Sequence, residues 1–131
     1  MSGSRLISEK RHWGEYTVLH YFDAGSEEHA LTKHLQINAG CNISYQYHHN
    51  RREIWTIISG EGLLALDGEI KKVSTGDVIE IPKEAKHSIK AICDLHIIEV
   101  QLGYPLIEED IVRLNTEWNE MVEATVPGRP I

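Results

Sequence analysis

Between Tyr16 and about Val100 the chain is divided into short runs rich in Val, Ile, Leu, Thr and Tyr, with Gly or Asp between them at roughly regular intervals. Short β-prone runs separated by turn residues are typical of an all-β sandwich or barrel. Asp67-Gly68 predicts a tight hairpin, because both residues tolerate the positive φ angles of a type I′ turn. We expect strands at 16–22, 30–37, 43–48, 53–59, 62–66, 69–73, 78–81, 87–91 and 95–102.

The periodicity changes after Pro105. Apolar residues then recur at helical spacing, and the acidic stretch 108–110 places negative charge where a helix N-terminus favours it. This pattern predicts one amphipathic α-helix over 107–123 that packs on the barrel. Residues 1–10 are expected to form a flexible N-terminus and residues 124–131 an irregular tail, which leaves a single domain over 11–123. The apolar positions of the helix are Ile107, Ile111, Leu114, Trp118 and Met121.

Length and charge narrow the class of protein. A chain of 131 residues with a hydrophobic fraction of 41% can form one globular domain. Its formal net charge of −7 disfavours nucleic acid and anionic membrane surfaces as partners. No apolar run is long enough to span a membrane, and residues 1–10 lack the apolar stretch of a secretion signal, so we expect a cytoplasmic protein. Cys41 and Cys93 are predicted to be reduced thiols without a catalytic role.

Four residues with metal-binding side chains are placed where strands can bring them together. Gln46 and His48 are two positions apart in an extended run, so both side chains point to one face. A short turn over 50–52 is expected to return Glu53 beside His48 on a paired strand. His87 begins a later strand, and a barrel lets residues distant in sequence share one interior. This donor set suits zinc, manganese, iron, cobalt or nickel.

The spacing of these residues resembles the two motifs of the cupin superfamily. That resemblance implies a cupin β-barrel, also called a double-stranded β-helix or jelly roll, to which we add the C-terminal amphipathic α-helix. It also implies a homodimer, because cupins commonly pair as dimers. The sequence departs from the motifs at Gln46, Glu84 and Ala91, where His, Gly and Asn are usual. The matching stretches are Gly40-x5-Gln46-x-His48-x4-Glu53-x6-Gly60 and Gly76-x5-Pro82-x4-His87.

The segment from Gln46 to Trp55 narrows the resemblance. It is similar to the motif Gln-x-His-His-His-Arg-x-Glu-His-Trp of the type II phosphomannose isomerases, which lies in a C-terminal cupin domain often attached to a sugar-nucleotide pyrophosphorylase. Asn50 and Ile54 depart from it. The similarity covers roughly residues 11–114, and we expect a stand-alone domain without the pyrophosphorylase. The resemblance implies zinc and the interconversion of mannose 6-phosphate and fructose 6-phosphate.

Such an isomerisation moves a proton between C1 and C2 through an enediolate, so a base must reach C2 and cations must stabilise negative charge. The candidate bases are Lys33, His49 and Glu99. Lys33 alternates with apolar residues that should point into the barrel. For the phosphorylated sugar we expect positive or polar groups in the barrel mouth, although a solvated surface role is as common for such residues. These substrate-binding candidates are Lys33, Arg51, Arg52 and Gln101.

Two other functions use the same residues. A cupin oxygenase would hold a redox-active iron with the same four ligands. A non-catalytic cupin would bind a sugar or its phosphate as a sensor or accessory module, since a fold does not fix a function. Metal identification separates the oxygenase from the isomerase, and a turnover assay separates the isomerase from the binding module.

Overall fold

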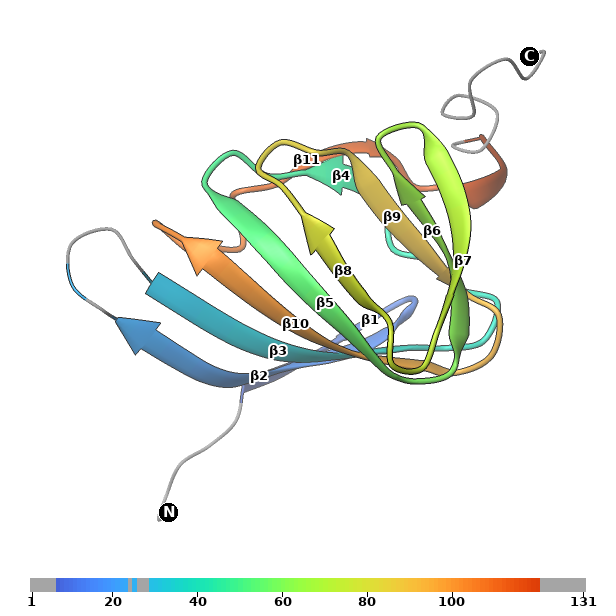
Figure 1. Ribbon diagram of the computed structural model, residues 1–131, viewed down its shortest axis with the longest axis horizontal. Coiled ribbons are helices and arrows are strands. Elements are labelled where there is room, and N and C mark those ends of the chain that lie inside the picture. Colours follow the sequence, from blue (N-terminus) through green and yellow to red (C-terminus); the bar gives the residue numbers. More distant parts are fainter. Residues whose placement is uncertain (1–6, 24, 26–28, 121–131) are drawn as a thin grey trace.

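In the computed structural model, residues 7–23, 25 and 29–120 are described, and they form two antiparallel β-sheets that face each other (Figure 1). The six-stranded sheet has the order β1 (Ile7–Arg11), β2 (Gly14–Asp23), β3 (His29–Ile37), β10 (Leu95–Gly103), β5 (Arg51–Ser59) and β8 (Val78–Ile81). The five-stranded sheet has the order β11 (Val112–Asn115), β4 (Tyr45–Tyr47), β9 (His87–Ala91), β6 (Glu61–Leu66) and β7 (Glu69–Ser74). The predicted all-β fold is confirmed.

The interior between the sheets has an apolar half and a polar half. Strands β3, β10 and β5 are neighbours, and their inward residues change character at the same level. Leu95 pairs with Ile37 in the apolar half, whereas Glu99 pairs with Lys33 in the polar half. Each apolar side chain in the first half stabilises the fold by about 1.5–3 kcal/mol relative to exposure. The fully buried aliphatic side chains are Ile37, Ile57, Leu64, Ile81, Ile89, Leu95 and Ile97.

Within the described residues, Asp67 and Glu84 are the non-glycine residues with positive φ angles. Asp67 has a φ of 46° and Gly68 of 86°, which confirms the predicted hairpin between β6 and β7. Glu84, which replaces the usual Gly of the second cupin motif, also lies in the left-handed region with a φ of 66°. The backbone N–H of Glu84 donates to the carbonyl of His48 over 2.9 Å. This bond ties the loop before β9 to the end of β4.

The prediction of a C-terminal helix over 107–123 is largely wrong. Residues 112–115 form strand β11, which pairs antiparallel with β4, and only residues 118–120 are helical within the described part of the chain. The edge of β4 has backbone groups that need partners, and pairing with β11 satisfies them. Trp118 then packs against Tyr45 and Ala65. The described residues contain no helix long and apolar enough to cross a membrane.

The predicted bounds of the domain also differ from the structure, or lie outside the described residues, at both ends. Residues 7–10, assigned to a flexible N-terminus, belong to β1, which pairs with β2. Residues 1–6, the helical stretch 121–123 and the predicted tail 124–131 lie outside the described residues. The extent of the domain therefore stays a prediction, as does the homodimer.

Candidate metal centre and adjoining pocket

Three of the predicted metal ligands come together between the two sheets. His48 follows β4, Glu53 lies in β5 and His87 opens β9, and all three side chains are buried. One candidate ligand atom from each lies within 4.8 Å of the others. The Nε2 atom of His48 is 3.3 Å from Oε2 of Glu53, and that of His87 is 3.9 Å from Oε1.

The expected pairing of the Glu53 strand with the His48 strand is wrong, because β4 and β5 belong to different sheets. The two residues meet across the barrel.

Backbone carbonyls orient both imidazoles. The Nδ1 atom of His48 donates to the carbonyl of Asp110 over 2.7 Å, and Nδ1 of His87 donates to the carbonyl of Ala85 over 2.9 Å. A hydrogen bond that fixes Nδ1–H leaves the Nε2 lone pair directed toward the centre, which is the usual arrangement of metal-binding histidines. Across residues 7–23, 25 and 29–120, Nε2 of His87 is the buried side-chain polar atom without a hydrogen-bond partner.

The charges of the three groups also suit a cation. Burial lowers the pKa of His48 to about 4 and lowers that of His87 as well, so both imidazoles are neutral at pH 7. Burial raises the pKa of the Glu53 carboxyl, but His87, Arg51 and His48 together outweigh burial and lower it to about 2. Two neutral imidazoles, one carboxylate and an unpartnered Nε2 fit a divalent metal ion.

Gln46, the fourth predicted ligand, lies next to these residues. It pairs with His87 across β4 and β9, and its Nε2 atom is 3.4 Å from Nε2 of His48. Its Oε1 atom accepts a hydrogen bond of 2.6 Å from the hydroxyl of Ser44. Gln46 therefore reaches the centre, but its amide oxygen faces Ser44 in this arrangement.

The guanidinium of Arg51 also contacts two of the three candidate ligands directly. Its Nε atom donates to Oε2 of Glu53 over 2.8 Å, and its Nη2 atom is 3.3 Å from Nε2 of His48. Nη1 donates to the carbonyl of Ile107 over 3.4 Å. Arg51 is buried, so this is an internal ion pair rather than a surface one. The other Glu53 oxygen, Oε1, accepts a hydrogen bond of 2.8 Å from the indole of Trp55.

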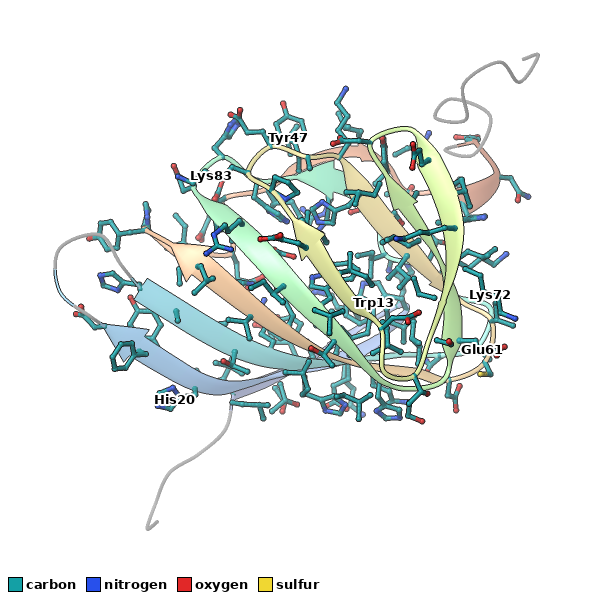
Figure 2. The ribbon with its side chains drawn as sticks, viewed as in Figure 1. Trp13, His20, Tyr47, Glu61, Lys72 and Lys83 are labelled. Atoms are coloured by element: carbon teal, nitrogen blue, oxygen red, sulfur yellow. The ribbon has the colours of Figure 1, made fainter. Side chains whose placement is uncertain are left out.

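A pocket of about 270 Å³ opens beside the centre. Figure 2 shows the side chains filling the space between the sheets, with Trp13 between them in this view and with His20 and Lys72 at the periphery. Gln46, Arg51 and Trp55 line the pocket next to the candidate metal centre. The pocket lining includes four cationic side chains, Arg11, Lys33, Arg51 and Arg113, and two carboxylates, Glu99 and Glu108. Such a lining in an acidic protein is suited to an anionic small molecule.

Lys33 is a buried cation of this pocket. Its Nζ atom donates to Oε2 of Glu108 over 2.7 Å and lies 4.3 Å from the ring centroid of Tyr16. Glu108 is half exposed, on the loop between β10 and β11. As the alternation with Leu35 and Ile37 indicated, Lys33 faces the interior. The ammonium group thus has one exposed carboxylate partner at the pocket.

Glu99 and Gln101 are the polar residues of β10 that face the interior. Both are buried, and Nε2 of Gln101 donates to Oε2 of Glu99 over 2.6 Å. Burial and the nearby charge of Glu53 raise the pKa of Glu99 to about 7, against the opposing effects of Lys33, Arg51 and the Gln101 hydrogen bond. Glu99 lines the pocket, so it is a carboxyl group whose pKa suits proton transfer at neutral pH.

His49 and Arg52 are not brought to the pocket. His48 and Arg51 are buried, whereas His49, in the bend between β4 and β5, and Arg52, which follows Arg51 in β5, are exposed. Nδ1 of His49 lies 3.0 Å from Oε2 of Glu84, and Nη1 of Arg52 donates to Oε2 of Glu80 over 3.3 Å. The roles predicted for His49 as a base and for Arg52 as a substrate ligand find no support in this placement.

The loop before β11 carries residues that the sequence interpretation missed. Besides Glu108, it contains Asp110, which is buried and whose carboxylate accepts hydrogen bonds of 2.9 Å from the backbone N–H groups of His49 and Asn50. The carbonyl of the same residue orients His48. A helical interpretation of this stretch concealed these contacts. What distinguishes Asp110 from its acidic neighbours is its burial. Burial is not visible in the periodicity of a single sequence, so the sequence held no usable signal for these contacts.

Comparison with known proteins gives the family. Residues 6–116 match the family described as Mannose-6-phosphate isomerase C-terminal. A mannose-1-phosphate guanylyltransferase of Escherichia coli K12 is 34% identical over 105 residues, which cover 79% of this chain and 21% of that protein. The alginate biosynthesis protein AlgA of Pseudomonas aeruginosa is 31% identical over 115 residues, which cover 86% and 23%. The chain spans about a fifth of the length of these relatives.

Solved structures support the same fold. The capsular polysaccharide assembling protein CapF of Staphylococcus aureus aligns with a TM-score of 0.65 and 16% identity, over 86% of this chain and 33% of that one. A putative sugar phosphate isomerase of Acidithiobacillus ferrooxidans aligns with a TM-score of 0.52 and 25% identity, over 56% and 49%. The fold is a cupin barrel, and the protein belongs to the mannose-6-phosphate isomerase C-terminal family.

Proposed function

We propose that this protein is a metal-dependent sugar-phosphate isomerase that interconverts mannose 6-phosphate and fructose 6-phosphate. The observation that carries the proposal is the adjacency of two features. A neutral two-histidine, one-carboxylate centre lies beside a pocket that holds both cations and Glu99, a carboxyl with a pKa near 7. The family match supports the substrate class.

In the proposed reaction His48, Glu53 and His87 would hold the metal, with Gln46 as an additional donor. Zinc is the proposed ion, and it would supply positive charge for the oxygens of the enediolate. Glu99, in its carboxylate form, removes the proton from C2 and then delivers the same proton to C1, while the hydroxyl proton of O2 passes to O1. Gln101 holds the Glu99 carboxyl in place through their hydrogen bond. Of the candidate bases, Glu99 is preferred because Lys33 is bound to Glu108 and His49 is exposed.

The phosphate group is proposed to bind on the cationic side of the pocket, with Lys33 as its buried contact. The carboxylate of Glu108 accepts a hydrogen bond from the ammonium group of Lys33. A dianionic phosphate would compete with Glu108 for the same ammonium group, and Glu108, being half exposed, can move into solvent. Glu108 therefore limits the affinity of the pocket for anions.

Opposite effects are expected from substitutions of these two residues. Lys33→Met should weaken binding of mannose 6-phosphate about 10–100-fold, since a charged hydrogen bond contributes about 1.5–3 kcal/mol. Glu108→Gln should strengthen it several-fold by removing the competing charge. Calorimetric titration measures both, with Lys72→Met, an exposed lysine paired with Glu61, as the matched control. If the affinity for mannose 6-phosphate changed in the same direction in both variants, Glu108 would not compete with the phosphate for Lys33.

The direct test of the function is turnover. Protein loaded with zinc, its metal content measured, is incubated with mannose 6-phosphate at neutral pH, and fructose 6-phosphate is assayed against His87→Ala protein treated with zinc in the same way. Formation of fructose 6-phosphate in the first sample alone is the expected result. Its absence from protein that contains the metal would rule out the isomerase.

A non-catalytic sugar-phosphate-binding module is the second candidate. The observation in its favour is that the pocket lining includes Arg51 but not His48, Glu53 or His87, so the proposed metal is screened from the pocket. Binding of mannose 6-phosphate without turnover by the zinc-loaded protein would support this module. The oxygenase alternative has no comparable support, because the aligned salicylate 1,2-dioxygenase is 17% identical and shows the fold alone.

A further inference from the structure

Arg51 stands between the pocket and the proposed metal ligands. It lines the pocket, and its guanidinium contacts Glu53 and His48 on the other side. Both contacts involve atoms that face the centre, namely Oε2 of Glu53 and Nε2 of His48. These are the lone pairs that a metal would need. Nε2 of His48 has a single lone pair, so it cannot accept a hydrogen bond from the guanidinium and bind a metal ion at the same time.

Arg51 compensates the negative charge of Glu53. Glu53 is buried, and a buried carboxylate without a compensating charge is strongly destabilising. The guanidinium of Arg51, whose Nε atom lies 2.8 Å from Oε2 of Glu53, supplies the compensating charge.

We propose that Arg51 is an exchangeable internal counter-cation, which stabilises Glu53 in the metal-free protein and is displaced when a divalent metal binds. The inference rests on the proposed metal site. Displacement lowers the apparent metal affinity, because the Arg51–Glu53 pair must first be broken. Displacement also removes the side chain that separates the pocket from the centre. Metal binding thereby opens the path from the pocket to the metal.

The neighbouring arginine provides a matched control. Arg52 carries the same charge one position along β5, but it faces solvent and pairs with Glu80. Zinc affinity is measured by competition with a chromophoric chelator for the wild type, Arg51→Gln and Arg52→Gln. We expect Arg51→Gln to bind zinc about tenfold more tightly or better, as the loss of a charged hydrogen bond from the competing state implies. Arg52→Gln should match the wild type.

The alternative role for Arg51 is to hold Glu53 in place for the metal, and it predicts the opposite sign. Equal or weaker zinc binding by Arg51→Gln overturns the inference and leaves the metal site intact. Tighter binding by both variants also overturns it, because the effect would then be general electrostatics. Failure of both the wild type and Arg51→Gln to bind zinc overturns the inference together with the proposed site.

A second measurement does not depend on the folding of Arg51→Gln. In wild-type protein labelled with ¹⁵N-arginine, the Nε–H of Arg51 donates to a buried carboxylate, so its exchange with water should be slow without metal. Saturation with zinc should make that exchange fast, while the Arg52 signal stays unchanged. Arg51→Lys assigns the resonance by its absence. Slow exchange that persists in the zinc-saturated protein would show that Arg51 is not displaced.

Discussion

Replacing His87 with alanine is expected to reduce zinc affinity at least about 100-fold, because loss of even an outer hydrogen-bond partner of a metal ligand typically reduces affinity about 10–100-fold. His87 is fully buried at the start of β9, and its Nε2 atom points to Glu53 and His48 without a hydrogen-bond partner in the described structure. Competition with a chelator measures the affinity. Isomerase turnover at a fixed low zinc concentration should fall with it.

Thermal unfolding gives an independent measure of the same site. A ligand at 100 times its Kd stabilises the folded state by about 2.7 kcal/mol, so zinc should raise the Tm of the wild type. It should leave the Tm of His87→Ala nearly unchanged. His20→Ala is the control, because His20 is exposed and lies at the periphery (Figure 2). A zinc-dependent rise in the Tm of His87→Ala equal to that of the wild type would contradict the metal centre.

The strands could be predicted from the sequence because each signal was local. Runs of β-prone residues and turn pairs such as Asp67-Gly68 depend on near neighbours, and the observed strands from β2 to β10 follow the predicted runs closely. The meeting of His48, Glu53 and His87 could be anticipated because a motif encodes a three-dimensional arrangement as spacing. The inward direction of Lys33 followed from its alternation with Leu35 and Ile37.

The remaining features depend on contacts that spacing does not express. The apolar positions Ile111 and Leu114 fit a helix, but the free edge of β4 is available only in the folded sheet, and pairing with it makes 112–115 a strand. His49 and Arg52 belong to the same motif as His48 and Arg51, yet His49 is exposed in the bend after β4 and strand alternation turns Arg52 outward. The contact of Arg51 with the metal ligands rather than with the pocket alone likewise required the fold.

Glu99→Gln is expected to have the largest effect on the chemical step. If Glu99 moves the proton between C2 and C1, its removal should lower kcat about 10²–10⁴-fold, the usual contribution of a general base, with little change in KM. Glutamine keeps the shape and can still accept the hydrogen bond from Gln101. Steady-state kinetics of the zinc-loaded protein measures the effect, with Glu69→Gln, an exposed residue of β7, as the control.

The pH dependence distinguishes a base from a structural role. Glu99 must be ionised to accept a proton, so the kcat of the wild type should rise with pH and level off above the pKa of Glu99. That pKa is about 7 in the metal-free protein, and a bound divalent cation would lower it, so the rising limb should lie at or below pH 7. The residual activity of Glu99→Gln should lack this limb. A variant that keeps both kcat and the limb would rule out Glu99 as the base.

The same group should affect stability, and the sign follows from the direction of its pKa shift. The folded protein raises the pKa of Glu99 from 4.5 to about 7, so it binds a proton that the unfolded chain has released between these values. The stabilisation from protonated Glu99 is therefore complete below pH 4.5 and is lost as pH rises through about 7. Above that pH, metal-free Glu99→Gln should be more stable than the wild type by about 1–3 kcal/mol. Urea unfolding at pH 5 and pH 8 measures the difference, and a wild type that gains stability relative to the variant between these pH values would contradict the raised pKa.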